Sequence, residues 1–230
     1  MATVETRPPT DAARPDYVPT AKTRIKRQQQ RARYDRASVY AILDAGLLCH
    51  VGYLIEGQPY VTPTAYWRDG ERVYWHGSSA SRMLRRLKDG VPVCITVALL
   101  DGLVLARSGF HSSINYRSVM AFGTALPVTD AADKEAALTA FSERLTPGRW
   151  AEMRPPTAQE LKATTVMTLQ LDEVVAKVRT GPPVDDEEDY ALPVWAGVLP
   201  LHTSLGQPEP DARLGDGVAV PGYLADVKIG

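Results

Sequence analysis

The sequence predicts a mainly β protein, an antiparallel barrel with inserted helices (α+β), and three observations support this fold class. Six or more short segments carry the apolar alternation or the β-branched and aromatic content of strands. Most of these segments are joined by short turns that contain glycine. The chain also lacks a glycine-rich dinucleotide fingerprint and a P-loop, which argues against a doubly wound parallel sheet.

Composition limits the classes of function that need to be considered. The chain has 230 residues, of which 44% are hydrophobic, and a net charge of −1. Such a charge gives no general attraction to nucleic acids or membranes. No apolar run reaches the roughly 18 residues of a membrane span, and residues 1–20 lack the apolar core of a secretory signal. We therefore expect a cytoplasmic protein with neither a nucleic acid nor a membrane as partner.

The proline-rich ends suggest tails around one domain. We expect a disordered N-terminal tail at 1–21, the barrel domain at 22–202 and a loose C-terminal tail at 203–230. The apolar segment 192–201 is expected to pack on the barrel or on a second subunit.

The first half of the domain should contain one helix and then strands in quick succession. Asp35 can cap a helix that ends before Gly46, and Glu56 with Gly57 fits a hairpin turn. The expected elements are a helix at 35–44 and strands at 47–55, 58–67 and 72–76.

The second half should add more strands and two capped helices. Asp101 and Gly102 are expected to form a hairpin turn. Asp130 can cap a long amphipathic helix, while Thr157 and Glu160 have capping-box spacing. The expected elements are strands at 91–100, 103–106, 117–128, 166–171 and 174–179, a loop at 107–116, and helices at 130–145 and 157–163.

Chemistry is concentrated between the strand at 72–76 and a helix at 80–88. The first turn of a helix carries unpaired N–H groups and a partial positive charge, so it suits an anion. Ser78, Ser79 and Ser81 add hydroxyl donors, and Arg82 adds a cation that can grip a phosphate with two hydrogen bonds. The alternative is an ordinary serine-capped surface helix. The stretch is therefore a candidate phosphate site.

The segment 72–82, with its final Ser81-Arg82 pair, resembles the phosphate loop of the pyridoxamine 5′-phosphate oxidase family, the FMN-binding split barrels. Residues 117–125 are similar to that family's Arg-Gln-Val strand, with Ser118 in place of the glutamine. Residues 59–66 match the strand whose backbone lines the flavin edge. The resemblance covers residues 24–202 and is strongest to flavin-nucleotide-binding proteins related to nitroimidazole-resistance reductases. In the loop before Asn115, this chain replaces a histidine and a methionine of that subgroup by Ser112 and Ile114.

The resemblance implies an antiparallel split β-barrel, an FMN cofactor and a homodimer with the cofactor at the subunit interface. His76 becomes the candidate catalytic residue, since imidazole titrates near neutral pH; the alternative is a strand-end histidine that only bonds the turn. No zinc-ligand spacing is present, so no metal site is expected. The implied cofactor contacts are Val61, Thr62, Pro63, Thr64, Tyr66, His76, Gly77, Ser78, Ser81, Arg82, Asn115, Tyr116, Arg117 and Ser118.

The expected function is an FMN-dependent oxidoreductase that passes hydride or electrons to a small organic acceptor or to oxygen. Pyridoxamine phosphate oxidation itself is disfavoured, because the chain lacks that enzyme's C-terminal Arg-x-His segment. Three alternatives remain open: a non-enzymatic flavin- or haem-binding module, a deazaflavin-dependent reductase, and a nucleic-acid binder that uses the basic segment 22–33.

Overall fold

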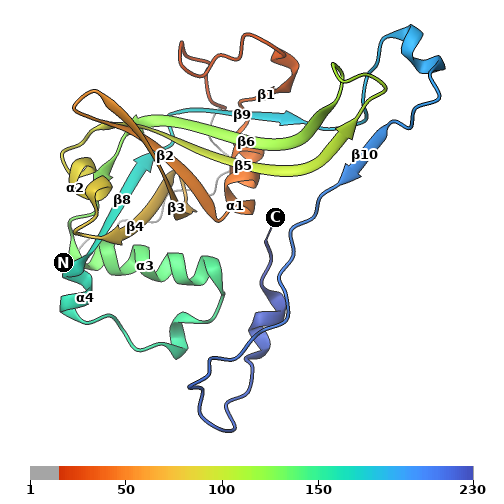
Figure 1. Ribbon diagram of the computed structural model, residues 1–230. Helices are drawn as coiled ribbons and strands as arrows, with labels where there is room; N and C mark the ends of the chain where they lie inside the picture. Colours follow the sequence, from red (N-terminus) through yellow and green to blue (C-terminus); the bar gives the residue numbers. More distant parts are fainter. Residues whose placement is uncertain (1–15, 230) are drawn as a thin grey trace.

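A computed structural model describes residues 16–229. Its strands form a single antiparallel ten-stranded sheet in the order β1-β9-β6-β5-β2-β3-β4-β8-β7, with β10 paired to β5. The sheet curls into a barrel that is open on one side (Figure 1). This confirms the mainly β, split-barrel fold class. The strands are β1 (Ala32–Arg33), β2 (Leu48–Ile55), β3 (Gln58–Asp69), β4 (Arg72–Ser78), β5 (Pro92–Leu105), β6 (Ser113–Thr124), β7 (Leu126–Pro127), β8 (Thr164–Gln170), β9 (Glu173–Arg179) and β10 (Gly197–Pro200).

The core lies inside the barrel because alternate residues of each strand point inward. Val51, Trp75, Ile95 and Val119 come from four different strands and are almost completely buried. Helix α1 (Arg36–Ala45) contributes Val39 and other apolar side chains to the same core. Among residues 16–229, no helix combines the length and the apolar character that crossing a bilayer requires.

The helices begin close to where their capping residues predict. The Asp35 carboxylate accepts a hydrogen bond from the Ser38 amide at the start of α1. Asp130 caps α3 (Ala131–Leu145), and Thr157 forms a complete capping box with Glu160 in α4 (Ala158–Ala163). Helix α2 (Arg82–Leu87) begins two residues later than expected, and the Ser81 side chain makes no capping hydrogen bond.

The predicted hairpin turn at Asp101 and Gly102 is wrong. Strand β5 continues through these residues with a register shift between Leu100 and Gly102. Gly102 serves a close approach instead of a turn: a Cβ there would lie 2.8 Å from the Leu199 carbonyl oxygen of β10. Because β5 is longer than expected, β6 begins at Ser113 and includes residues 115 and 116, which were predicted to lie in a loop.

The structure describes part of the expected N-terminal tail and all but the last residue of the expected C-terminal tail. Residues 1–15 of the N-terminal tail at 1–21 lie outside the described residues. Tyr17, inside the same predicted tail, is buried, and the Arg36 guanidinium lies 4.4 Å from its ring centre. Beyond β10 the chain runs away from the barrel as a long arm (Figure 1). Near the end of this arm the Tyr223 hydroxyl donates a hydrogen bond to Glu152.

Candidate functional site

Strand β3 has an open edge where it separates from β4. The β3–β4 ladder joins residues 66–69 to residues 72–75 and then stops, while β4 continues on β8 as far as Ser78. Over residues 58–65, β3 is paired only with β2, on its other side. Alternate N–H and C=O groups along this open edge have no strand partner among the described residues. Such groups need hydrogen bonds from water or from a ligand.

The turn between β4 and α2 stands beside this open edge. A 2.7 Å hydrogen bond from the Ser79 amide to the Ala163 carbonyl fixes it to α4, and the Ser81 amide bonds the Ser78 carbonyl at 2.9 Å. The exposed Arg82 guanidinium lies 4.5 Å from the ring centre of Tyr60 on β3. Within residues 16–229 no carboxylate forms an ion pair with Arg82. The Ser78 hydroxyl accepts a hydrogen bond from the Ala80 amide at 3.2 Å. The turn therefore presents a positioned cation and several serine hydroxyls, which together suit a phosphate.

His76 lies on the outer face of β4, beneath helix α3. Its ring is 4.7 Å from the ring of Phe141, edge-on, and 5.8 Å from that of Trp67. Its Nδ1 is buried and has no hydrogen-bond partner in the described part of the chain. Burial lowers the pKa of His76, so its imidazole is neutral at pH 7. A neutral ring with an uncommitted nitrogen is better suited to bind a ligand than to carry charge.

The structure does not place every expected contact at the open edge. Tyr66 points into the barrel: it is 1% exposed, and its hydroxyl donates to the Leu43 carbonyl at 2.5 Å. Because a core residue offers no surface to a cofactor, we leave Tyr66 out of the proposed site. Thr62 shares a hydrogen bond with the Tyr53 hydroxyl, whereas the Val61 side chain is 67% exposed on the outer face.

The expected contacts on β6 already have partners in the protein. Asn115 is buried and donates to the Gly181 carbonyl. The Arg117 guanidinium donates hydrogen bonds to the Asp101 carboxylate, and this pairing raises the pKa of Arg117. Ser118 donates to the Lys177 carbonyl at 3.2 Å.

Within one chain, β6 and the open edge of β3 are not neighbours. Strands β5 and β2 lie between β6 and β3, so residues 115–118 are roughly 14 Å from the open edge along the sheet, at ~4.8 Å per strand. One chain therefore does not bring its two groups of expected contacts into one site.

A mostly apolar hollow of about 360 Å³ shares Tyr60 with the Arg82 corner, the turn formed by residues 78–82, none of which lines the hollow. Its wall includes Tyr60, whose ring contacts the Arg82 guanidinium, and the neighbouring Val61. Gly52 and Cys94 widen the hollow across β2 and β5 because their side chains are small. The hollow is large enough for a heterocyclic ring system.

Two contacts of the site had no signal in the sequence. Tyr60 meets Arg82 only because α2 folds back over β3, and Phe141 meets His76 only because α3 covers β4. Such contacts join segments that are distant in sequence, so neither periodicity nor capping patterns predict them.

A family model described as pyridoxamine 5′-phosphate oxidase matches residues 35–178. The chain belongs to this family. The expected family resemblance is therefore confirmed. A comparison with curated proteins gave no match.

Solved structures of this family include similar chains. The flavocytochrome Anf3 from Azotobacter vinelandii is 48% identical, with a TM-score of 0.89 over 94% of this chain and 100% of that one. The FAD and haem binding protein from Mycobacterium smegmatis is 36% identical, with a TM-score of 0.83 over 86% of this chain and 97% of that one. A putative 5-nitroimidazole antibiotic resistance protein from Bacteroides thetaiotaomicron shares the fold, at 24% identity and a TM-score of 0.53, over 64% of this chain and 86% of that one.

Proposed function

We propose that this protein binds a flavin nucleotide at the open edge of β3 and acts as an oxidoreductase. The observation that carries the proposal is the position of the Arg82 guanidinium, which has no carboxylate partner in the described chain and stands beside unpaired β3 backbone. A flavin needs both features, a cation for its phosphate and hydrogen-bonding groups along its ring edge. When bound, it would supply hydride or single-electron transfer.

The protein's own part in this function is to bind and orient. Arg82 and Ser81 hold the phosphate through charge-assisted and hydroxyl hydrogen bonds. Backbone groups of residues 59–65 offer donors and acceptors to the ring edge. The proposed reaction transfers hydride or electrons to a small organic acceptor or to oxygen.

The phosphate corner suits FMN and FAD equally, because both contain the same ribityl phosphate. The sequence resemblance implies FMN, whereas the relative from M. smegmatis is described as a FAD and haem binding protein. The hollow lined by Tyr60 and Val61 offers room for a second ring system. We therefore propose FAD ahead of FMN.

Haem is a second candidate cofactor, favoured by one residue. The neutral His76 imidazole has a buried nitrogen without a protein partner in the described region, and His76 would be the residue that holds a haem, which would supply electron-transfer chemistry. Two similar proteins are a flavocytochrome and a FAD and haem binding protein.

We also propose a homodimer as the working unit. The outer face of the sheet exposes apolar side chains that monomeric proteins normally cover. Leu48, Leu54 and Val61 on β2 and β3 lie on this face, together with Leu100 of β5. A second copy would cover them and would bring its own β6 residues toward the open edge.

The test is the visible spectrum of the purified protein and the chemical identity of the released chromophore. We expect flavin absorption bands, with FAD in the supernatant after acid denaturation, and a Soret band from haem. Colourless protein that takes up neither FMN nor FAD in calorimetry would overturn the flavin assignment. A flavin spectrum without a Soret band after reconstitution with haem would remove only the haem candidate.

A further inference from the structure

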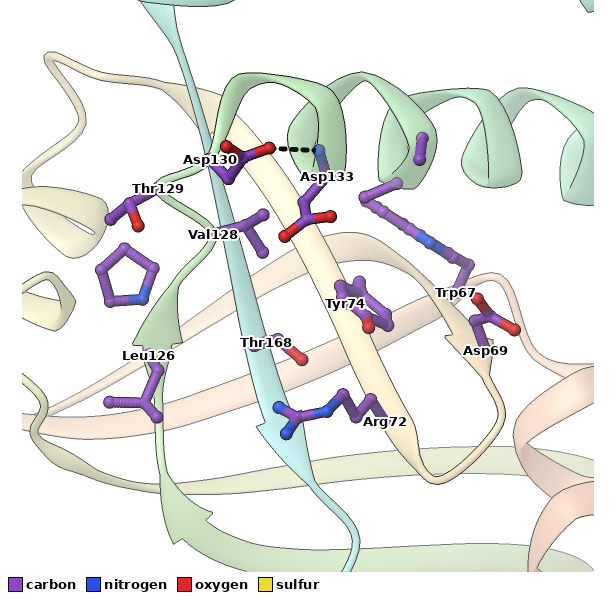
Figure 2. A pocket seen from close by; sticks show the side chains of 13 residues that line it. Trp67, Asp69, Arg72, Tyr74, Leu126, Val128, Thr129, Asp130, Asp133 and Thr168 are labelled. Carbon is purple, nitrogen blue, oxygen red and sulfur yellow. Dashed lines mark hydrogen bonds between the residues drawn. The ribbon is translucent and has the colours of Figure 1, made fainter. Parts of the chain in front are cut away.

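A second and larger pocket, of about 530 Å³, lies between α3 and the outer face of the sheet. We call it the α3 pocket. Its lining includes none of the residues at the Arg82 corner or along the open edge of β3. Figure 2 shows Asp130 and Asp133 on α3 along one wall, with Arg72 and Thr168 on strands β4 and β8 along the opposite wall.

Charges of opposite sign face this pocket from different elements. Asp69 closes one end and Asp133 stands on the first turn of α3, while Arg72 projects from β4 (Figure 2). Asp130 uses one carboxylate oxygen to cap α3. Within residues 16–229, the side chains of Asp69, Asp133 and Arg72 take part in no ion pair. Three carboxylates against one guanidinium favour a ligand with net positive charge that also carries an anionic group.

Two buried polar side chains contribute to the pocket lining. Thr168 is 7% exposed, and its hydroxyl is directed toward Tyr74, whose pKa it lowers through a side-chain hydrogen bond (Figure 2). The Nε1 of Trp67, which is 1% exposed, has no hydrogen-bond partner in the described structure. A buried donor without an acceptor is costly, so a ligand that supplies an oxygen acceptor to Trp67 would remove a penalty.

The pocket has an aromatic side wall. Trp67 and Tyr74 are stacked, with ring centres 5.6 Å apart and planes inclined by 14°. Burial raises the pKa of Tyr74. The charge of Arg72 and the hydrogen bond with Thr168 lower this pKa, and the smaller effects of Asp69 and Asp133 raise it. Both carboxylates therefore lie close enough to this ring to influence a cation placed beside it.

We propose that the α3 pocket binds a basic amino acid. Its ammonium groups lie at Asp69 and Asp133, its carboxylate pairs with Arg72, and its aliphatic chain lies along Tyr74. A haem or a nucleotide does not suit this pocket, because their negative groups would meet three aspartates. The site is independent of the flavin site.

A comparison of the affinities for L-lysine and for its decarboxylated analogue cadaverine separates the contribution of Arg72 to binding from that of the aspartates. We expect saturable lysine binding in calorimetry with the protein as purified, and cadaverine binding about tenfold weaker, because cadaverine lacks the carboxylate that Arg72 would hold. Arg72→Gln should remove this preference. The double variant Asp69→Asn/Asp133→Asn should weaken the binding of both ligands by about tenfold or more.

The control is Glu135→Gln, which removes an exposed carboxylate from the same helix outside the pocket lining. Its affinity for lysine should equal that of the unmodified chain, and circular dichroism verifies the fold of every variant. Absence of lysine binding at millimolar concentration would overturn the proposal, as would equal affinities for lysine and cadaverine. If the double aspartate variant does not fold, the proposal is tested by Arg72→Gln: equal affinities for lysine and cadaverine in this variant support it, and a retained preference for lysine overturns it.

Discussion

Arg82 shows how one side chain acquires a role from its surroundings. On a short surface helix an arginine usually remains solvated. Here the Tyr60 ring lies under the guanidinium at 4.5 Å, and no carboxylate pairs with Arg82 in the described chain. The charge is thus held in place and remains available, which is the arrangement that phosphate binding requires.

Replacing Arg82 by alanine should weaken flavin binding by about 1.5–3 kcal/mol, the contribution of a hydrogen bond to a charged group. Titration calorimetry of the cofactor-free protein with FMN and with FAD measures the effect. Arg85→Ala is the matched control, because Arg85 is exposed on the same helix. Equal losses of flavin affinity in both variants would show that only the overall positive charge of the helix matters. An unchanged affinity in Arg82→Ala would refute the phosphate role.

The environment of His76 makes stability depend on pH. Burial lowers its pKa in the folded chain, and the rings packed against it, Trp67 and Phe141, carry no charge. As pH falls below the unfolded value of about 6.5, the unfolded chain takes up a proton before the folded chain does. The stabilisation that is present at higher pH is then lost.

The variant His76→Phe should therefore lose less unfolding free energy than the unmodified chain when the pH is lowered from 7.5 to 5.5. Phenylalanine preserves the ring packing and does not titrate. Urea unfolding of the cofactor-free proteins at both pH values measures the difference. Identical pH dependence of the two proteins would show that His76 gains its proton in the folded state as easily as in the unfolded state.

At the scale of the elements, the end of α1 approaches β3 so closely at Gly46 that a side chain there would clash. A Cβ on Gly46 would lie 2.7 Å from the Tyr66 hydroxyl and 2.8 Å from Cγ1 of Val97. Gly46 has φ −83°, so the close approach, and not backbone conformation, requires glycine. The contact holds Tyr66 in the core, where its hydroxyl satisfies the Leu43 carbonyl.

Gly46→Ala should lower the free energy of unfolding by about 1–3 kcal/mol, the usual cost of overpacking. Adding Tyr66→Phe should recover part of the loss because it removes the nearer clashing atom. Urea unfolding of the two single variants and the double variant gives the coupling energy. Strict additivity of the two substitutions would contradict the described packing.

The sequence predicts the boundary of a helix or strand correctly where the residues that cause it are close together in the chain. Asp35, Asp130 and Thr157 start helices where the sequence predicts them, because a cap acts on amides only two or three residues away. Asp101 and Gly102 have the composition of a turn but lie within β5, since their partners are Arg117 on β6 and the backbone of β10. Only the folded sheet brings these partners to them.

At the scale of the whole molecule, the exposed apolar face is the feature that a single chain leaves unexplained. Leu48, Leu54 and Val61 contribute to this face, and the β6 residues expected at the cofactor are separated from β3 by two strands. Two-fold assembly through this face would resolve both points, because each copy covers the apolar side chains of the other.

Val61→Lys should convert the protein to a monomer and reduce flavin retention, because a buried lysine at the interface lacks a partner. Met153→Lys, which adds the same charge at an exposed apolar position between α3 and α4, should change neither property. Sedimentation velocity gives the oligomeric state, and the ratio of flavin to protein absorbance gives the occupancy. A monomeric unmodified protein that still retains flavin would exclude the dimer.

The order of short alternating strands, the capped helices and the Ser81-Arg82 corner were determined by residues close together in the chain, because strand alternation, capping and short turns act over a few positions. The parting of β3 from β4, the burial of Tyr66 and the placement of His76 under Phe141 were decided only in the folded molecule. Each of these depends on which strands become neighbours and which helix covers them. Those pairings are set by burying apolar surface across the whole barrel, and no short stretch of sequence contains that information.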